Sequence, residues 1–301
     1  MTGLAFALTA AALFSAPGYG RAQSAPSTAG TLLVAHGGTA EWNAPVLELA
    51  ERVRAKTGAP VGVAFLMGKY APEHRFQDVA ARLVREGADR LVIVPVLASS
   101  HSGHYGQIEY LAGERDALSE RMMHHLHEAG IERPDVVVPI TLTPAVDASA
   151  EVAGILSDRA LALADAPESQ ALSIVGHGPN EAENYARWME NLRPVADSVA
   201  ALTGFRDVKL GLLRDDAPDP VRAEAVRRIR EIIRLQHDLT GRTVVVVPIL
   251  ISKGYISTRK LPRDLEGLPV AYDGEGLLPH PGVADWVARR VREALSERAS
   301  R

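Results

Sequence analysis

Two histidines with glycines beside them follow an apolar run in the stretch LVIVPVLASSHSGHYGQIEY, residues 91–110. The run has the composition of a buried strand, and His101 and His104 stand in the polar segment directly after it. A third histidine, His36, ends the apolar run TLLVAHG and is followed by two glycines that leave room for a ligand. Neutral imidazole is a good ligand for divalent ions such as Co²⁺, Ni²⁺, Zn²⁺ and Fe²⁺. The chain contains no cysteine, so any metal would be held by histidine, carboxylate, methionine or water.

A single histidine at the end of a strand is often only a hydrogen-bonded turn residue. Here His36, His101 and His104 follow two strands in the same half of the chain. Because the carboxyl ends of parallel strands lie at one edge of a sheet, we expect these side chains to lie close together. This grouping favours a metal site over a set of polar turns.

The elements that would position these histidines alternate between apolar strands and amphipathic helices from residue 31 onward. Continuous Val, Ile and Leu strands joined by helices indicate a parallel sheet with helices on both faces. The predicted strands are TLLVA, PVGVAFL, RLVIVPVL and DVVVPI, and the predicted helices run over about 45–56, 76–85, 115–129 and 148–164.

The second half of the chain repeats this plan. The segment ALSIVGHG matches TLLVAHG and places His177 opposite His36, while VKLGLLRDDAP matches VGVAFLMGKYAP and VVVVPIL matches LVIVPVL. We therefore predict the α/β class, with two similar domains at residues 31–167 and 168–301. Each domain would be a parallel sheet flanked by helices, with a cleft between the two domains.

The first 30 residues differ from the remainder. An apolar run from Leu4 to Phe14 is followed by small residues and proline, with an A-x-A-like site near Ala22. This pattern predicts a signal peptide and a linker, and therefore an exported, periplasmic protein. The run is too short to span a bilayer, so we do not expect a membrane-spanning chain.

Charge and loop composition argue against two classes of partner. The net charge of −4 does not favour binding to nucleic acid, which requires a basic face. We find no glycine-rich loop of the kind that cradles phosphates, so no nucleotide cofactor is expected.

The ordered set LLVAHG, VAFL…P and VPVL…GH resembles the ATP-independent (class II) tetrapyrrole chelatases, in particular the sirohydrochlorin cobaltochelatases and ferrochelatases of cobalamin and sirohaem synthesis. The resemblance spans about residues 31–295. It implies insertion of Co²⁺ or Fe²⁺, with Ni²⁺ as a further option, into a tetrapyrrole held between two lobes. It also implies that His36 and His104 face the metal as catalytic residues, with His101 as a competing choice because this loop is spaced differently.

Such insertion requires a metal that is held loosely enough to be released, which suits two neutral imidazoles better than a closed cage. It also requires a base for the pyrrole N–H protons, and imidazole can serve near pH 7.

Met67 is the main departure from the family pattern, which has glutamate after the AFL strand. A thioether cannot accept a proton, and Glu73 and Glu109 are the nearest acids that could replace the missing one. Methionine with two histidines would favour softer metals or iron already inside a porphyrin. We expect Met67 either to contact the substrate or to pack in the core.

The loop SKGYISTRK in the second half has Tyr255 and Ile256 where a histidine would stand, so one metal site per chain is expected. Lys253, Arg259 and Lys260 remain in this loop, and cations there would bind the carboxylates of a sirohydrochlorin-like macrocycle. We expect Lys253, Tyr255, Arg259 and Lys260 to contact the macrocycle, with a solvated basic turn as the alternative.

Two other functions remain open from the sequence. An exported carrier of metal or haem could keep the fold without turnover, and a carboxylate close to His36 and His104 would favour the enzyme instead. A metal-dependent hydrolase would need a carboxylate-rich site, which the strand ends do not offer.

Overall fold

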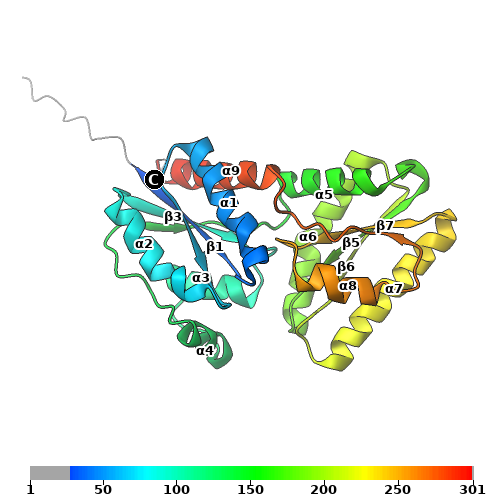
Figure 1. Cartoon of the computed structure of the whole chain (residues 1–301), viewed down its shortest axis with the longest axis horizontal. Helices are drawn as coiled ribbons and strands as arrows, with labels where there is room; N and C mark the ends of the chain where they lie inside the picture. Colours follow the sequence, from blue (N-terminus) through cyan, green and yellow to red (C-terminus); the bar gives the residue numbers. More distant parts are fainter. Residues whose placement is uncertain (1–27, 300–301) are drawn as a thin grey trace, which may run out of the picture.

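The structure, a computed structural model, describes residues 28–299, with the backbone alone at residues 297–299. Residues 1–27, which hold most of the predicted signal peptide and linker, lie outside the described part. Two four-stranded parallel sheets form two lobes side by side (Figure 1). This arrangement confirms the predicted α/β class with two similar units.

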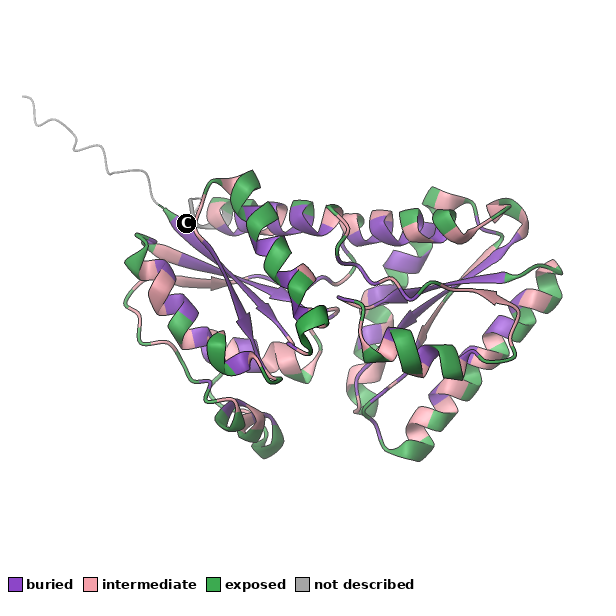
Figure 2. Ribbon diagram, viewed as in Figure 1, coloured by how far each residue is buried: buried purple, intermediate pink, exposed green. Residues whose placement is uncertain are grey.

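The first sheet has the strand order β2-β1-β3-β4, with every pair parallel. Three of its strands, β1, β2 and β3, are almost entirely buried, as their continuous Val, Ile and Leu composition requires, whereas the edge strand β4 is half-buried (Figure 2). The strands are β1 (Ala29–Ala35), β2 (Val61–Phe65), β3 (Arg90–Val96) and β4 (Ile140–Leu142). The helices of this half are α1 (Ala40–Thr57), α2 (Phe76–Arg85), α3 (Gly103–Ala112) and α4 (Glu120–Glu128), with a short η1 turn at Ala71–Glu73.

The second sheet has the equivalent order β6-β5-β7-β8. Its strands are β5 (Ala171–Gly176), β6 (Asp207–Leu212), β7 (Val244–Ile249) and β8 (Val270–Ala271). The remaining elements here are η2 (Pro167–Ser169), α6 (Ala182–Thr203), α7 (Asp219–Thr240), η3 (Ile256–Lys260) and α8 (Leu261–Asp264). The register repeats as well, since Ala35 pairs with Phe65 in the first sheet and Gly176 pairs with Leu212 in the second.

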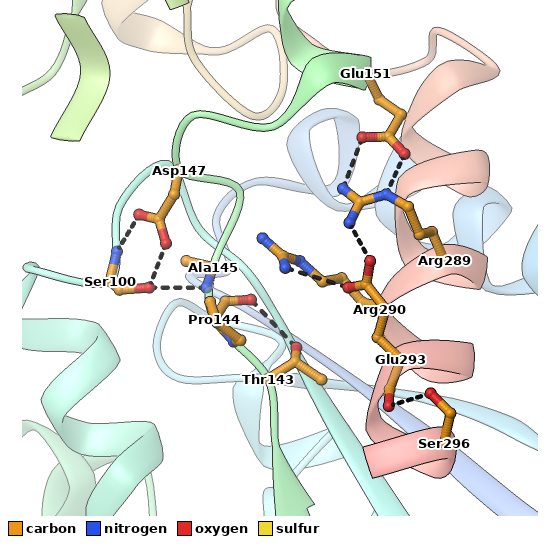
Figure 3. Close-up of polar contacts among 10 residues, drawn as sticks. All are labelled: Ser100, Thr143, Pro144, Ala145, Asp147, Glu151, Arg289, Arg290, Glu293 and Ser296. Carbon is orange, nitrogen blue, oxygen red and sulfur yellow. Dashed lines mark hydrogen bonds and ion pairs between the residues drawn. The ribbon is translucent and has the colours of Figure 1, made fainter. Parts of the chain in front are cut away.

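The last helix of each half packs on the other half. Helix α5 (Ala150–Leu163) contacts α6 and β7 of the second lobe, whereas α9 (Gly282–Ala299) contacts α1 and β3 of the first (Figure 1). Arg289 of α9 donates two hydrogen bonds to the carboxylate of Glu151 at the start of α5, at 2.6 and 2.8 Å (Figure 3). The division of the chain near residue 167 stays a prediction. In the fold, each lobe is completed by a helix from the other half of the chain.

Three predicted elements differ from the structure. The strand expected in DVVVPI is displaced, because β4 begins only at Ile140. The helix expected over 115–129 is confined to α4. The segment after β3 was expected to be a loop, but α3 begins at Gly103, so that His104 lies in the first turn of a helix. No helix in the described range combines the length and the apolar composition that crossing a bilayer would require.

Candidate metal site

His36 lies at the carboxyl end of β1, where the chain turns away from the sheet. Its Nδ1 lies 2.7 Å from the carbonyl oxygen of Gly37, which can only accept a hydrogen bond, so Nδ1 carries the proton and Nε2 keeps a free lone pair. Gly37 has a φ of +87°, and a Cβ at this position would lie 2.2 Å from the carbonyl oxygen of Met67. The glycine after His36 is therefore required by a close backbone approach. Burial lowers the pKa of His36 below its ordinary value.

His104 is positioned by the start of α3. The Ser102 hydroxyl accepts a hydrogen bond from the Tyr105 N–H at 3.0 Å, which caps the helix and fixes its first turn. The side chain of Gln107 then sets the tautomer of His104. Its Nε2 donates to the Met122 carbonyl at 2.7 Å, so its Oε1 faces His104 Nδ1 at 2.8 Å and accepts from it. Nε2 of His104 is consequently a free acceptor, as a metal ligand must be.

The loop between β3 and α3 is held by a second contact. The Asp147 carboxylate accepts hydrogen bonds from the Ser100 N–H at 2.8 Å and from the Ser100 hydroxyl at 2.6 Å (Figure 3). Ser100 Oγ in turn accepts from the Ala145 N–H at 2.9 Å. These bonds tie the loop before His104 to the segment after β4, so the histidine is carried by a restrained part of the chain.

The structure brings His36 and His104 together. Their ring centroids lie 4.7 Å apart with an interplanar angle of 89°. Burial, followed by the nearby His36, lowers the pKa of His104 to about 4. Both rings are therefore neutral at pH 7, with Nε2 available on each. His101 is exposed on the same loop, and the pairing with His36 is made by His104 instead.

Met67 follows β2 beside this pair but brings no charge to it. Its backbone N–H donates to the His36 carbonyl at 2.9 Å, and its side chain is half-buried. Of the two acids considered as replacements, Glu109 is bonded to Arg115 at 2.7–2.9 Å, and Glu73 is exposed in η1. The carboxylate whose charge raises the pKa of His36 is instead Asp216, from the second half.

The second half presents a charged counterpart to the neutral pair. Nδ1 of His177 lies 2.6 Å from the Gly178 carbonyl, and its Nε2 lies 3.2 Å from Asp216 Oδ2. Burial alone would lower the pKa of His177, but the hydrogen bonds to Asp216 and Gly178 outweigh it and raise the pKa. The same bond from His177 lowers the pKa of Asp216 to about 2. His177 and Asp216 thus form an ion pair whose charges act on His36 across the site.

His177, Asp215 and Asp216 form the one group of three potential metal ligands found among residues 28–299, with ligand atoms within 4.8 Å of one another. Asp215 is buried and already neutralised, because it accepts from Arg222 at 3.0 Å and from Lys260 at 2.6 Å. We therefore interpret this group as an ion-pair network rather than a metal cage.

Sequence reasoning placed His177 opposite His36 but did not assign either aspartate to the site. The usable signal was the match between RDDAP and MGKYAP in the repeat.

The cations predicted to bind a macrocycle are only partly free. Lys260 is bonded to Asp215 and Lys253 is bonded to Glu275. Arg259 and Tyr255 are exposed, and the Lys260 Nζ lies 5.9 Å from the centroid of the Tyr255 ring.

The two lobes meet beside His36 through Trp42. The Trp42 ring centroid lies 6.3 Å from that of His36, and the Ser252 hydroxyl of the second lobe donates to the Trp42 carbonyl at 3.0 Å. A Cβ on Gly254 would lie 2.8 Å from the Trp42 ring, so only glycine allows this approach. The histidine pair consequently lies where the two lobes touch.

Comparisons with known proteins agree with this architecture. A family model described as CbiX matches residues 30–163 and again residues 171–294. Among solved structures, SirB from Bacillus subtilis with Fe³⁺ is 18% identical with a TM-score of 0.66, and the match covers 91% of this chain and 98% of that one. DR2241 from Deinococcus radiodurans, a multi-domain protein described as structurally similar to chelatases, is 17% identical with a TM-score of 0.55. That match covers 88% of this chain and 54% of the other. No curated protein matches the chain.

Proposed function

Because the chain belongs to the CbiX family, we propose that it is a metal chelatase of the sirohydrochlorin type. It would insert Co²⁺ or Fe²⁺ into a tetrapyrrole without ATP. The observation that carries the proposal is the pair of buried, neutral histidines whose Nδ1 atoms are both engaged and whose Nε2 atoms are both free.

The metal ion is a substrate of this reaction, so the site must bind it and then release it. The His36–His104 pair meets this requirement. Two imidazoles bind a borderline divalent ion but leave most of its coordination positions to water or to the incoming macrocycle. A closed set of four protein ligands would retain the ion instead. Low pKa values keep both rings unprotonated over the physiological range, so protons do not compete with the metal.

The same low pKa values alter the expected role of these histidines in proton transfer. With a pKa of about 4, His104 is a weak proton acceptor at pH 7, so it binds metal better than it takes pyrrole protons. No acid stands at Met67, and the carboxylate that acts on His36 is Asp216, which is bonded to His177 on the opposite lobe. We assign to Asp216 the role of drawing the dication toward the cleft and of stabilising it during transfer.

The macrocycle would lie between the lobes, with its carboxylates toward the segment 253–260. Arg259 is exposed and is the cation there with no ion pair among the described residues. Replacing Arg259 by Ala is expected to weaken tetrapyrrole binding by about tenfold, the effect of one charge-assisted hydrogen bond. Lys253→Ala is the matched control, because Lys253 is already bonded to Glu275.

The deciding experiment is an absorbance assay with purified protein, sirohydrochlorin and Co²⁺ or Fe²⁺. Wild type should insert metal faster than the uncatalysed reaction, His36→Ala and His104→Ala should not, and His101→Ala should retain the rate. A wild-type rate equal to the uncatalysed one would refute the enzyme.

A carrier that binds metal or haem without turnover is the second candidate. The observation in its favour is that Met67 stands where the family has its acid, so no carboxylate of the first lobe joins the histidine pair. A carrier would bind both metal and macrocycle in the same assay but would form no product above the uncatalysed rate.

We also propose that the protein acts outside the cytoplasm, on the basis of the apolar run and A-x-A-like site near its start. Fractionation of cells that express the full chain tests this proposal. Retention of the unprocessed chain in the cytoplasm would contradict it.

A further inference from the structure

Helix α4 carries several metal-binding side chains that have no role in the proposed metal insertion. Its nine residues, ERMMHHLHE, include three histidines and two methionines, all of them side chains that can bind metals. The helix packs directly against α3, which carries His104. The Met122 carbonyl accepts the hydrogen bond from Gln107, and a Cβ on Gly103 would lie 3.0 Å from the Met122 sulfur.

His125 faces inward from α4. Its Nδ1 is buried and has no hydrogen-bond partner, although a buried polar atom is normally paired. The same helix touches the residue that positions His104, because the Met122 carbonyl accepts from Gln107, and Gln107 is bonded to His104. An unpaired, buried imidazole nitrogen on the helix that packs against α3 is explained if the nitrogen is itself a metal ligand for part of the time.

His124 and His127 lie on the outer side of the same helix. Three residues apart, they share one helical face and line an open hollow of about 400 Å³ together with Met123, Asp116 and Glu120. Imidazole, thioether and carboxylate groups therefore surround a space that solvent can enter. Arg121, at the start of α4, also pairs with Glu181 of the second half at 3.4 Å, which places this end of the helix beside the other lobe.

None of these side chains joins a ready-made site. Among residues 28–299, the ligand atoms of the α4 histidines do not form a group of three within 4.8 Å of one another or of the His36–His104 pair. Two-ligand sites that are separated in space bind an ion weakly and exchange it readily, in contrast to a storage site.

We propose that α4 is the entry route for the divalent metal ion. The ion is captured from solvent at His124 and His127, passes to His125, and is delivered to His36 and His104. This inference rests on the proposed function, because it assumes that the buried pair is the destination of the metal. Each step is a ligand exchange, in which a bond from the next imidazole nitrogen forms as a bond to water or to the previous nitrogen breaks. The oxidation state of the ion does not change, and neutral imidazoles release no proton.

The test measures the rate of loading separately from the affinity at the pair. Stopped-flow mixing of the full chain with Co²⁺ would be followed by quenching of Trp42 fluorescence, because this ring lies 6.3 Å from His36. His125→Gln is expected to slow loading at least about tenfold and to leave the equilibrium affinity within about twofold. The double variant His124→Gln/His127→Gln should slow loading mainly at low Co²⁺ concentration. His237→Gln, in α7 of the second lobe, is the matched control and should load like wild type.

Unchanged loading in both α4 variants would overturn the route, and so would a large loss of affinity in His125→Gln, which would make His125 a permanent ligand. His125→Asn repeats the test if the glutamine variant does not fold. The route and the proposed function can fail separately. If the loading of Co²⁺ depends on His125 but no metallated product forms, the entry route stands and the proposed enzyme activity is wrong. If the protein inserts metal but the loading rate does not depend on His125, the proposed enzyme activity stands and the entry route is wrong.

Discussion

Removal of His104 should change how the stability of the protein depends on pH. In the folded chain the pKa of His104 is about 4, because the ring is buried beside His36, against an ordinary value of 6.5. Between these two values the unfolded chain binds a proton at this position and the folded chain does not. The free energy of unfolding therefore rises with pH across this window and falls on acidification.

The magnitude follows from the difference of about two and a half pKa units, at roughly 1.4 kcal/mol per unit. The full effect is roughly 3 kcal/mol, of which about 2 kcal/mol is lost between pH 7 and pH 5. His104→Gln carries no titrating group, so its free energy of unfolding should fall less over this interval, by about 2 kcal/mol. Urea denaturation of the metal-free protein at pH 7 and pH 5 measures this change in the free energy of unfolding for wild type and for His104→Gln.

A matched control is available on the same loop. His101 is exposed, so His101→Gln makes the same change of residue type outside the buried pair and controls for the substitution itself. An equal pH dependence of the free energy of unfolding in wild type and His104→Gln would show that the surroundings do not hold His104 neutral, so that protons would compete with the metal at this ring.

Three further outcomes are expected. Arg289→Ala should lower the free energy of unfolding by about 2 kcal/mol, because it leaves the Glu151 carboxylate without its two charge-assisted hydrogen bonds. A double-mutant cycle with Glu151→Gln, measured by urea denaturation, should show coupling, and additive effects would contradict the contact. Asp216→Asn should lower the pKa of His177 in an NMR titration and weaken Co²⁺ binding in calorimetry, and an unchanged pKa would contradict the ion pair. Met67→Glu should tighten Co²⁺ binding about tenfold by adding a carboxylate to the pair, and unchanged binding would show that Met67 does not face the metal.

The sheets could be predicted from the sequence because their signal is local. Each strand is a short Val, Ile and Leu run, and the sequence of runs repeats in the second half, so two similar parallel sheets could be predicted, but not the order of the strands within them. The exchange of α5 and α9 has no such signal. Periodicity shows that a helix has an apolar face but not which sheet that face covers, and here α5 packs on β7 and α9 packs on β3, each a strand distant in the sequence.

The candidate site, like the fold, could be predicted only in part. His36 could be predicted because it follows a strand directly, and strand ends of a parallel sheet converge. His104 was favoured over His101 only through the family resemblance, since both stand in the segment after β3. The start of α3 was missed because Gly103 and Gly106 weaken the helical pattern, whereas the Ser102 cap that begins the helix acts through three-dimensional geometry. Asp216 was missed because its partner, His177, determines its role, and a carboxylate at a strand end gives no sign of which imidazole it will contact.

The two halves of the chain share one backbone arrangement around their strand-end histidines, but the two histidines differ in charge. The N–H after each second strand donates to the carbonyl of the strand-end histidine, from Met67 to His36 at 2.9 Å and from Arg214 to His177 at 2.7 Å. In the first half the neighbouring side chain is an uncharged thioether, so burial dominates and the histidine stays neutral. In the second half Asp216 outweighs burial and the histidine is charged. A neutral imidazole can bind a cation and an imidazolium cannot, so His36 rather than His177 has the charge state that suits a metal ligand. Asp216 is held in its ion pair with His177 across the cleft, so it is not grouped with the ligand atoms of the His36–His104 pair.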